Sequence, residues 1–532
     1  MIYLKQSAAF KKTFLIIPIF LILGIGLSYF YANQNFFYNF KPYYLKAYAA
    51  YFEYASDNIM SVFRRGEFYA GGAGLNEKAQ SVPVLVYHGI LPKIDESNSE
   101  ASEGTNVSID QFKDHMFTLK RAGWNAVSIE DFYLFMQGKK DLPKKSFLLT
   151  FDDGRKESYY PADPILSALN FRAVMFAITK FSLLPKSYYY LTTPELKQMI
   201  SSGRWEIEAH AEGAHEFIPI NENGDRSFFL PNRMWLFDQG RLETMDEYKS
   251  RIKGDLAAVK EGLKNTLGVD AIAFAFPSGE FGENSENIPG GPEDVILNFS
   301  KENFKMTFHQ FGLGERFRAN YPDPGKDFFT IKRMGVRFEW SGEELVKLLE
   351  QGNAKKLPFK DQDFADSGWV STGWGIIDFM NNTLYMHPKN DGTGVAAVLD
   401  GTRHWKNYIF SARVNWPKGK NVYLWARYQD DDNYVACNFS NKLIHIEQTV
   451  DGELGVIKGE SGNYTFPEGD FTLGILVDGR RAECMIDGKT VLATDFLDSS
   501  LSTGGIGVKA WDPILDNSEI IIKEVNVDAL AD

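Results

Sequence analysis

Cysteine is scarce in this sequence, because the 532 residues contain only Cys437 and Cys484. A disulfide framework and a thiolate metal cluster are therefore excluded from the first 436 residues, and any metal site there has to use histidine and carboxylate ligands. Whether the two cysteines pair with each other stays open at this point, since a disulfide needs α-carbons within about 7 Å.

Basic runs, internal repeats and low-complexity tracts are also missing. The net charge is −13, and no cluster of lysine or arginine offsets it locally. An acidic chain of this kind is not expected to bind a polyanion such as nucleic acid. The content of 44% hydrophobic and 24% charged residues is ordinary for a globular protein, and the length predicts more than one domain.

Long hydrophobic runs are limited to the amino terminus. Residues 13–32 carry no charge over 20 positions, which is about the length that a membrane-spanning helix requires. Lys5, Lys11 and Lys12 precede the run, so the positive-inside rule predicts that the rest of the chain is extracytoplasmic. We expect residues 1–32 to form a cytoplasmic stub and an uncleaved single-pass anchor in the cell membrane, followed by a stalk and linker over residues 33–80. A cleaved signal peptide is the alternative.

Residues 81–352 alternate apolar strands with capped helices. Ser108 with Gln111, and Thr244 with Glu247, have the spacing of capping boxes. The strand candidates are VPVLVYH, FLLTF, AVMFAI, WEIEAH and AIAFAF. This alternation predicts an α/β domain with parallel strands. After a polar run, residues 364–532 contain only short strands separated by turns, which predicts an all-β sandwich.

The strand FLLTF runs directly into two adjacent carboxylates, Asp152 and Asp153. Two neighbouring negative charges at the end of a buried strand repel each other unless a cation or a proton lies between them. The pair therefore favours a metal site. An Asx-type turn that caps the next helix is the alternative interpretation.

A second apolar segment, WEIEAHAEGAH, ends in His210 and His215. The spacing of five residues does not place both imidazoles on one helical face, but a loop can fold both of them onto one ion. Imidazole and carboxylate ligands together suit Zn, Co, Ni or Fe in the divalent state. Two exposed loop histidines are the alternative.

Four ordered motifs resemble one known family. The TFDDG run, the two histidines, the FAFPSGEFG segment and the IKRMGV segment around Arg333 are similar to the polysaccharide deacetylases, also called NodB-homology or carbohydrate esterase family 4 enzymes. The resemblance covers roughly residues 81–350. It implies a distorted β/α barrel, one divalent metal ion, with zinc favoured, and hydrolysis of N-acetyl groups on an N-acetylated polysaccharide.

The resemblance also implies roles for individual residues. Asp152 matches the general base, while Asp153, His210 and His215 match the metal ligands. The third motif brings Pro277 and Gly279, which would line the substrate groove, although both residues also suit a simple turn.

This sequence departs from the commonest family pattern at two points. Its two histidines are five residues apart, as in the subgroup that deacetylates poly-β-1,6-N-acetylglucosamine, and no Leu-x-His motif follows Arg333 to supply the general acid. The same subgroup places a histidine at the end of the first strand. That position is His88 here, which the resemblance makes the expected acid, with His309 in reserve.

The carboxy-terminal strands loosely resemble laminin-G or concanavalin-like jelly rolls, which often bind glycans. Trp374, Trp405, Trp425 and Trp511 could stack on sugars if they are exposed, or belong to the core of a spacer domain.

We therefore predict a membrane-anchored, metal-dependent deacetylase of an extracytoplasmic N-acetylhexosamine polysaccharide. An exopolysaccharide is the favoured substrate. The alternatives are a peptidoglycan N-acetylglucosamine deacetylase and a catalytically silent glycan-binding protein. The sequence identifies no protein partner.

Overall fold

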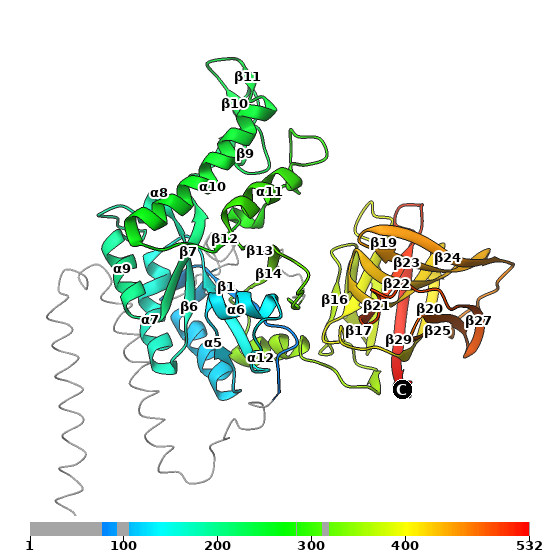
Figure 1. Cartoon of the computed structure of the whole chain (residues 1–532). Coiled ribbons are helices and arrows are strands. Elements are labelled where there is room, and N and C mark those ends of the chain that lie inside the picture. Colours follow the sequence, from blue (N-terminus) through cyan, green and yellow to red (C-terminus); the bar gives the residue numbers. More distant parts are fainter. Residues whose placement is uncertain (1–76, 93–105, 284, 311–318, 531–532) are drawn as a thin grey trace, which may run out of the picture.

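The computed structural model describes residues 77–92, 106–283, 285–310 and 319–530, which form a β/α barrel and a β-sandwich beside it (Figure 1). In this part of the chain no helix combines the length and the apolar character needed to cross a membrane. The predicted anchor at residues 13–32 and nearly all of the predicted stalk lie outside the described residues.

Seven parallel strands form the barrel. They follow the order β1-β14-β13-β12-β7-β6-β5, and the barrel closes because β1 pairs with β5 as well as with β14. The strands are β1 (Val84–Tyr87), β5 (Ser146–Phe151), β6 (Ala173–Ile178), β7 (Trp205–Ala211), β12 (Ala273–Ala275), β13 (Met306–Gln310) and β14 (Phe329–Gly335). All five strand candidates of this domain are confirmed, and the predicted distortion consists of seven strands in place of eight.

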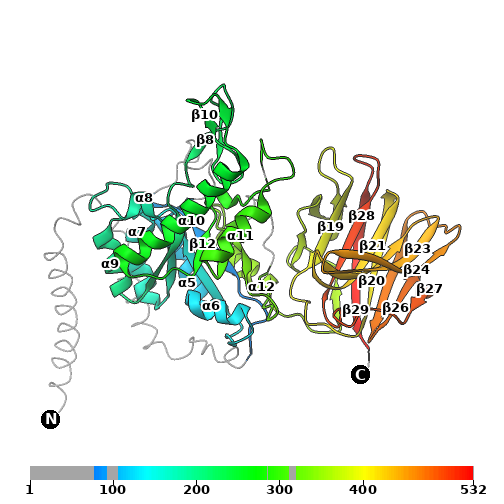
Figure 2. The same cartoon turned by 45° about the horizontal axis from the view of Figure 1, so that its top comes forward.

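Helices surround these strands, as the tilted view shows most clearly (Figure 2). They are α5 (Ile109–Arg121), α6 (Ile129–Met136), α7 (Lys156–Leu169), α8 (Thr179–Ser182), α9 (Thr193–Ser201), α10 (Met245–Leu267), α11 (Glu293–Asn303) and α12 (Gly342–Gln351). Both predicted capping boxes are present, at Ser108 for α5 and at Thr244 for α10. A short 3₁₀ turn, η1 (Pro277–Gly279), follows β12.

Short strands complete the barrel domain. They are β2 (Ile90–Leu91), β3 (Val107–Ser108), β4 (Asn125–Ala126), β8 (Phe217–Pro219), β9 (Arg226–Phe228), β10 (Trp235–Leu236) and β11 (Arg241–Leu242). The β8–β9 and β10–β11 hairpins lie between β7 and α10 and project from the barrel (Figure 1).

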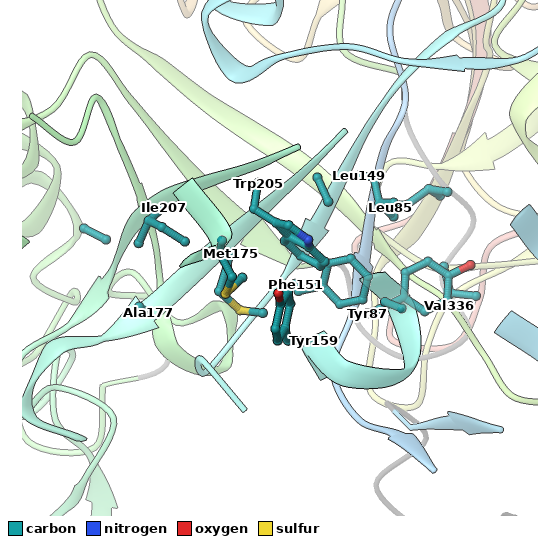
Figure 3. Close-up of a cluster of buried hydrophobic side chains, with 14 of the residues drawn as sticks. Leu85, Tyr87, Leu149, Phe151, Tyr159, Met175, Ala177, Trp205, Ile207 and Val336 are labelled. Atoms are coloured by element: carbon teal, nitrogen blue, oxygen red, sulfur yellow. The ribbon is translucent and has the colours of Figure 1, made fainter. Parts of the chain in front are cut away.

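Strand alternation divides the apolar residues of the barrel into two layers. Phe151 of β5 packs outward against Trp205, with ring centroids 5.2 Å apart, and Tyr159 of α7 joins this outer layer (Figure 3). Leu148 faces the interior, where Phe132 of α6 packs against Phe308 of β13. The amide of Ile129, at the start of α6, donates to Glu206 near the start of β7, so α6 lies toward the amino-terminal ends of the strands and leaves their carboxyl ends for a functional site.

The sandwich consists of two antiparallel sheets around one apolar core. One sheet has the order β17-β18-β29-β20-β25-β26-β27, with β15 also paired to β29, and the other has the order β16-β19-β28-β21-β22-β23-β24. The first sheet contains β15 (Phe359–Asp361), β17 (Ile376–Met380), β18 (Thr383–His387), β20 (Tyr408–Lys418), β25 (Asp470–Asp478), β26 (Arg481–Ile486), β27 (Lys489–Thr494) and β29 (Glu519–Ala529). The second contains β16 (Trp369–Ser371), β19 (Gly394–Leu399), β21 (Asn421–Asp430), β22 (Asn433–Phe439), β23 (Leu443–Val450), β24 (Glu453–Ser461) and β28 (Gly505–Trp511).

A disulfide crosses the sandwich core. It joins Cys437 of β22 to Cys484 of β26, with the α-carbons 5.6 Å apart, and so links the two sheets. The structure thus answers the question that the sequence left open.

Hydrogen bonds connect the sandwich to the barrel domain. The amide of Ala319 donates to Asp400 over 3.1 Å, and the amide of Gly401 donates to the hydroxyl of Tyr321 over 2.6 Å. Lys355 donates to the carbonyls of Gln351 and Asp400, and burial lowers the pKa of its ammonium group to about 8. The polar run between the two domains is therefore partly buried at their contact.

Candidate metal and catalytic site

The predicted site residues meet at the carboxyl ends of the barrel strands. Asp152 and Asp153 follow β5, His210 lies in β7, and His215 lies in the loop after β7. Parallel strands open their carboxyl ends toward the same side of a barrel, so motifs far apart in the sequence converge there.

Asp153, His210 and His215 form a three-residue cluster whose potential ligand atoms all lie within 4.8 Å of one another. The Nε2 atoms of His210 and His215 are 3.3 and 3.1 Å from Oδ1 of Asp153. Burial alone would raise the pKa of Asp153, but hydrogen bonds from the two imidazoles in their protonated form hold it well below its usual range. Asp153 also adopts a positive φ of 72°, a conformation that aspartate tolerates better than most residues.

The proton position on His210 indicates that this cluster fits a cation. Its Nδ1 lies 2.8 Å from the carbonyl oxygen of Ala275, which can only accept a hydrogen bond. The neutral ring therefore carries its proton on Nδ1 and turns the lone pair of Nε2 toward the carboxylate of Asp153. Two acceptors that face each other in a buried site need a cation or a proton between them. Two imidazoles and one carboxylate suit a divalent transition metal and leave positions for water and substrate.

The loop that carries His215 is held from α10. Asp255 accepts hydrogen bonds from the amides of Gly213, over 2.6 Å, and Glu212, over 3.3 Å. Burial raises the pKa of Asp255, although these amide bonds favour its charged form. Asp255 therefore fixes the backbone between the two histidines without touching either imidazole in the contacts described.

Asp152 is bound by a buried arginine from β14. Arg333 donates from Nη1 to Oδ1 over 2.6 Å and from Nη2 to Oδ2 over 2.7 Å, and the side chains of Arg333 and Asp152 are 0% and 3% exposed. Burial alone would raise the pKa of Asp152, but the Arg333 guanidinium holds it below its ordinary value. Each aspartate thus binds its own partners inside the site. The alternative interpretation, in which the pair only forms a turn that caps the next helix, does not account for these contacts.

The structure separates the two candidate acids. Nε2 of His88 lies 3.9 Å from Oδ2 of Asp152, so His88 stands next to the site. Burial lowers the pKa of His88, while the two aspartates oppose this effect. His309 packs edge-on against Phe281, and burial, with Lys332 and Arg333 nearby, lowers its pKa to about 3. Burial therefore lowers the pKa of both imidazoles, and the position of His88 beside Asp152 distinguishes it as the candidate acid.

The third motif lies beside the second histidine. Pro277 lines a small cavity of about 10 Å³ together with His215 and Phe217 of the β8–β9 hairpin. Gly279 has a φ of 74°, and a Cβ there would stand 3.1 Å from the carbonyl oxygen of Gln310. The structure thus brings Pro277 next to the cluster and gives Gly279 a backbone reason to be glycine.

Three residues near the site gained no role from the sequence. In the sequence Arg333 stands out only as part of the IKRMGV motif. Phe329 and Ile331 precede it at alternating interior positions, and this alternation is the available signal. Arg155 pairs with Glu157, and its guanidinium lies 5.2 Å from the ring centroid of Tyr189. Asp255 gave no signal, because its role depends on tertiary contact between α10 and a loop.

The comparisons with known proteins agree with the motifs. Residues 139–289 match the family model described as polysaccharide deacetylase. A poly-β-1,6-N-acetyl-D-glucosamine N-deacetylase of Escherichia coli K12 is 28% identical over 187 residues, which cover 33% of this chain and 28% of that protein. A poly-β-1,6-N-acetyl-D-glucosamine N-deacetylase of Staphylococcus aureus is 29% identical over 130 residues, covering 24% of this chain and 44% of that protein.

Among solved structures, a de-N-acetylase from Aggregatibacter actinomycetemcomitans is similar, with 21% identity and a TM-score of 0.42, covering 50% of this chain and 99% of that one. The aligned part of this chain covers less than half the length of the E. coli and S. aureus relatives. The resemblance to polysaccharide deacetylases predicted from the sequence is confirmed by the family-model match over residues 139–289.

Proposed function

We propose that this protein hydrolyses N-acetyl groups on an extracytoplasmic N-acetylhexosamine polysaccharide, with poly-β-1,6-N-acetylglucosamine as the favoured substrate. The observation that carries the proposal is the division of labour between two adjacent aspartates. Asp153 faces His210 and His215, while Asp152 is bound on both oxygens by Arg333. The names of the E. coli and S. aureus relatives and the five-residue spacing of the histidines support this polymer.

Asp152 acts as the general base of the reaction. Its bond to Arg333 keeps the carboxylate ionised and fixes its plane, so an oxygen lone pair is ready to take a proton from the attacking water. The departing amine needs a proton. His88 stands 3.9 Å from Asp152, and its imidazolium form delivers that proton to the nitrogen as the carbon–nitrogen bond breaks, which leaves a neutral imidazole.

Asp153, His210 and His215 hold one divalent metal ion, with zinc preferred by this donor set. When bound, such an ion supplies Lewis acidity toward the acetyl carbonyl and toward water. Nδ1 of His210 donates a hydrogen bond to the carbonyl of Ala275, which orients this imidazole for the ion. Asp255 accepts a hydrogen bond from the amide of Gly213 and so positions the loop that carries His215.

The uncharged run at residues 13–32 anchors the protein, and the lysines before it keep the amino terminus cytoplasmic. The disulfide between Cys437 and Cys484 supports an extracytoplasmic location independently, because disulfides persist in oxidising compartments. Protease treatment of intact cells tests this topology. Protection of the sandwich from added protease, together with cleavage after lysis, would contradict it.

Acetate release from β-1,6-linked N-acetylglucosamine oligomers tests the activity. We expect release that stops with a chelator and returns when zinc or cobalt is added. Release from β-1,4-linked peptidoglycan fragments alone would move the assignment to a cell-wall deacetylase. No release from either substrate, with metal bound, would indicate a protein that binds glycans without hydrolysing them.

A further inference from the structure

The outer surface of the β16-β19-β28-β21-β22-β23-β24 sheet carries aromatic rings and charged groups. We call it the aromatic face and define it by Trp374, Tyr423, Trp425, Tyr434, Lys509 and Trp511. These side chains belong to or flank an apolar cluster separate from the sandwich core. Trp405, in contrast, packs in the core, so three of the four predicted tryptophans remain as candidates for sugar stacking.

Two glycines make room for the rings on this face. A Cβ at Gly394 would stand 2.5 Å from Cη2 of Trp374, and a Cβ at Gly507 would stand 2.8 Å from Cε3 of Trp425. The two indoles therefore rest directly on the backbone of β19 and β28. Trp425 also stacks on Tyr428 at an interplanar angle of 9°, with Tyr434 beside it. On this outer face Trp374, Tyr434 and Trp511 are half-buried, so their rings supply the accessible aromatic surface. Tyr423 and Trp425 are buried.

Charged groups are set among the rings. Nζ of Lys509 lies 4.8 and 4.9 Å from the ring centroids of Trp374 and Tyr423. Glu447 is only 6% exposed, and its carboxylate lies 2.7 Å from Nε2 of His445. Attraction between Lys509 and Glu447 partly offsets the burial that lowers the pKa of Lys509. The net charge of this group is close to zero while its hydrogen-bonding capacity is high.

One donor on this face is left without a partner in the structure. Trp425 is 5% exposed, and its buried Nε1 forms no hydrogen bond with the described residues. A buried N–H group without a partner is costly, and native proteins rarely keep one unless a ligand or water satisfies it. This donor is an independent indication that the face receives a ligand with acceptor groups.

We infer that the aromatic face binds uncharged N-acetylated sugar units of the polysaccharide that the barrel deacetylates, an assignment that rests on the proposed function. Aromatic rings stack on the apolar C–H faces of pyranoses, and Lys509, Glu447 and Trp425 bind hydroxyl and acetamido groups. The balanced charge suits the acetylated polymer better than a polyanion or the polycation that deacetylation produces. The sandwich therefore holds substrate and releases product.

The position of the face supports this role. Val398 and Tyr428, which belong to the same apolar cluster as Trp425, line a cavity of about 690 Å³. Barrel residues, among them Asn320 and Lys332, also line it. That volume lies within the range of small-ligand sites. None of the predicted catalytic or metal residues lines this cavity, so it extends the sandwich surface toward the barrel without being the reaction site.

Affinity electrophoresis of the whole chain tests the inference. Gels contain poly-β-1,6-N-acetylglucosamine, its fully deacetylated form or alginate, with chelator present so that the polymer is not altered. We expect retardation by the acetylated polymer only, and at least a tenfold weaker Kd for Trp374→Ala and for Lys509→Met. Phe496→Ala is the matched control, because this ring is 73% exposed on the same domain but lies outside the face. Trp374→Phe, which keeps a ring, should recover most of the affinity and guards against a folding defect.

Each other outcome has a defined meaning. Equal retardation of wild type and Trp374→Ala, or preference for the deacetylated polymer or alginate, overturns the inference. A change in sedimentation of Trp374→Ala without a change in retardation would make the face a contact between two copies and also overturns it. Acetate release measured on the same protein with metal separates the two proposals. Release without retardation overturns only the glycan face, and retardation without release overturns only the deacetylase.

Discussion

Among the described residues, the barrel and the sandwich each contain one fully buried arginine, and the two arginines bind different partners. Arg333 in the barrel binds both oxygens of Asp152. Arg427 in the sandwich donates to the main-chain carbonyls of Lys406, Gly479 and Leu501. The partners distinguish the two roles. An arginine that donates to main-chain carbonyls stabilises the loops that carry them. An arginine that binds a carboxylate at the open end of a barrel lowers the pKa of that carboxylate and keeps a potentially reactive group ionised.

The same contrast extends to the other charged groups. In the barrel they converge at the carboxyl ends of the strands, where Asp153 and two histidines surround a point suited to a cation. In the sandwich Glu447 and Lys509 lie on an outer sheet face among aromatic rings. We interpret the first arrangement as a catalytic site and the second as a glycan-binding surface, and the following variants test that distinction.

The largest effect is expected from Asp152→Asn. The amide cannot take a proton from water, so kcat for acetate release should fall by about 10²–10⁴, the usual contribution of a general base. Metal content should stay near that of the wild type, because Asp152 is not one of the three clustered ligands. Asp131→Asn, at a surface ion pair with Lys140, is the control. A kcat within tenfold of wild type would remove Asp152 from the base role.

The two arginines give the next test. Arg333→Gln removes the cation that lowers the pKa of Asp152, so this pKa should rise and the carboxylate should be protonated over more of the acidic range. The loss of rate should therefore be greatest at low pH, and the acid limb of the pH–rate profile should shift to higher pH. Breaking a buried pair of this kind also costs about 3–5 kcal/mol of stability.

Arg427→Gln is the partner experiment. It leaves main-chain carbonyls without donors and should lower the unfolding free energy by about 1–3 kcal/mol, while the pH–rate profile keeps its position. Urea unfolding and the pH–rate profile are measured for both variants. Identical pH–rate profiles for Arg333→Gln and wild type would show that the two arginines are equally structural.

Removal of the disulfide should affect the sandwich alone. The cross-link closes a loop of 47 residues, and its loss in Cys437→Ser/Cys484→Ser should lower the stability of the sandwich by about 2–4 kcal/mol. The rate of acetate release at 25 °C should not change, because the bond lies in the sandwich core. Thermal unfolding followed by near-UV circular dichroism, alongside the rate, measures both effects. An equal loss in the barrel would mean that the two domains unfold together.

Local sequence predicted the elements and the ligand cluster for identifiable reasons. FLLTF and WEIEAH are short apolar runs with polar ends, and parallel strands bring such ends together. The contacts of Arg333 and Asp255 could not be predicted in the same way, because they join residues 181 and 42 positions apart. Pairing of the two cysteines likewise depends on the spacing between two sheets.

The tryptophans of the sandwich show a different limit. Trp405 and Trp425 look alike in sequence, yet one enters the core and the other the outer face. Strand alternation assigns Trp425 only when the register is known. The pairings of β21 with β22 and β28 both shift after this residue, so that Tyr428, three positions later, joins the same cluster. A pattern of period two cannot place side chains across such a shift.

The smallest effect concerns the loop between the two histidines, and it separates positioning from ligation. Asp255→Ala removes the acceptor for the amides of Gly213 and Glu212, so His215 loses its fixed approach while all three ligands remain. Metal affinity should fall by about 10–100-fold, the usual cost of losing an outer partner of a metal site. Asp255→Asn keeps one acceptor oxygen and should recover part of that loss, whereas Asp246→Ala, in the exposed first turn of α10, should change nothing. Titration with zinc, followed by calorimetry, measures the affinity, and saturating zinc should restore kcat in Asp255→Ala. If kcat stayed low at full occupancy, Asp255 would act on the reaction itself, and the barrel site would extend further into α10 than the three ligands and Asp152 require.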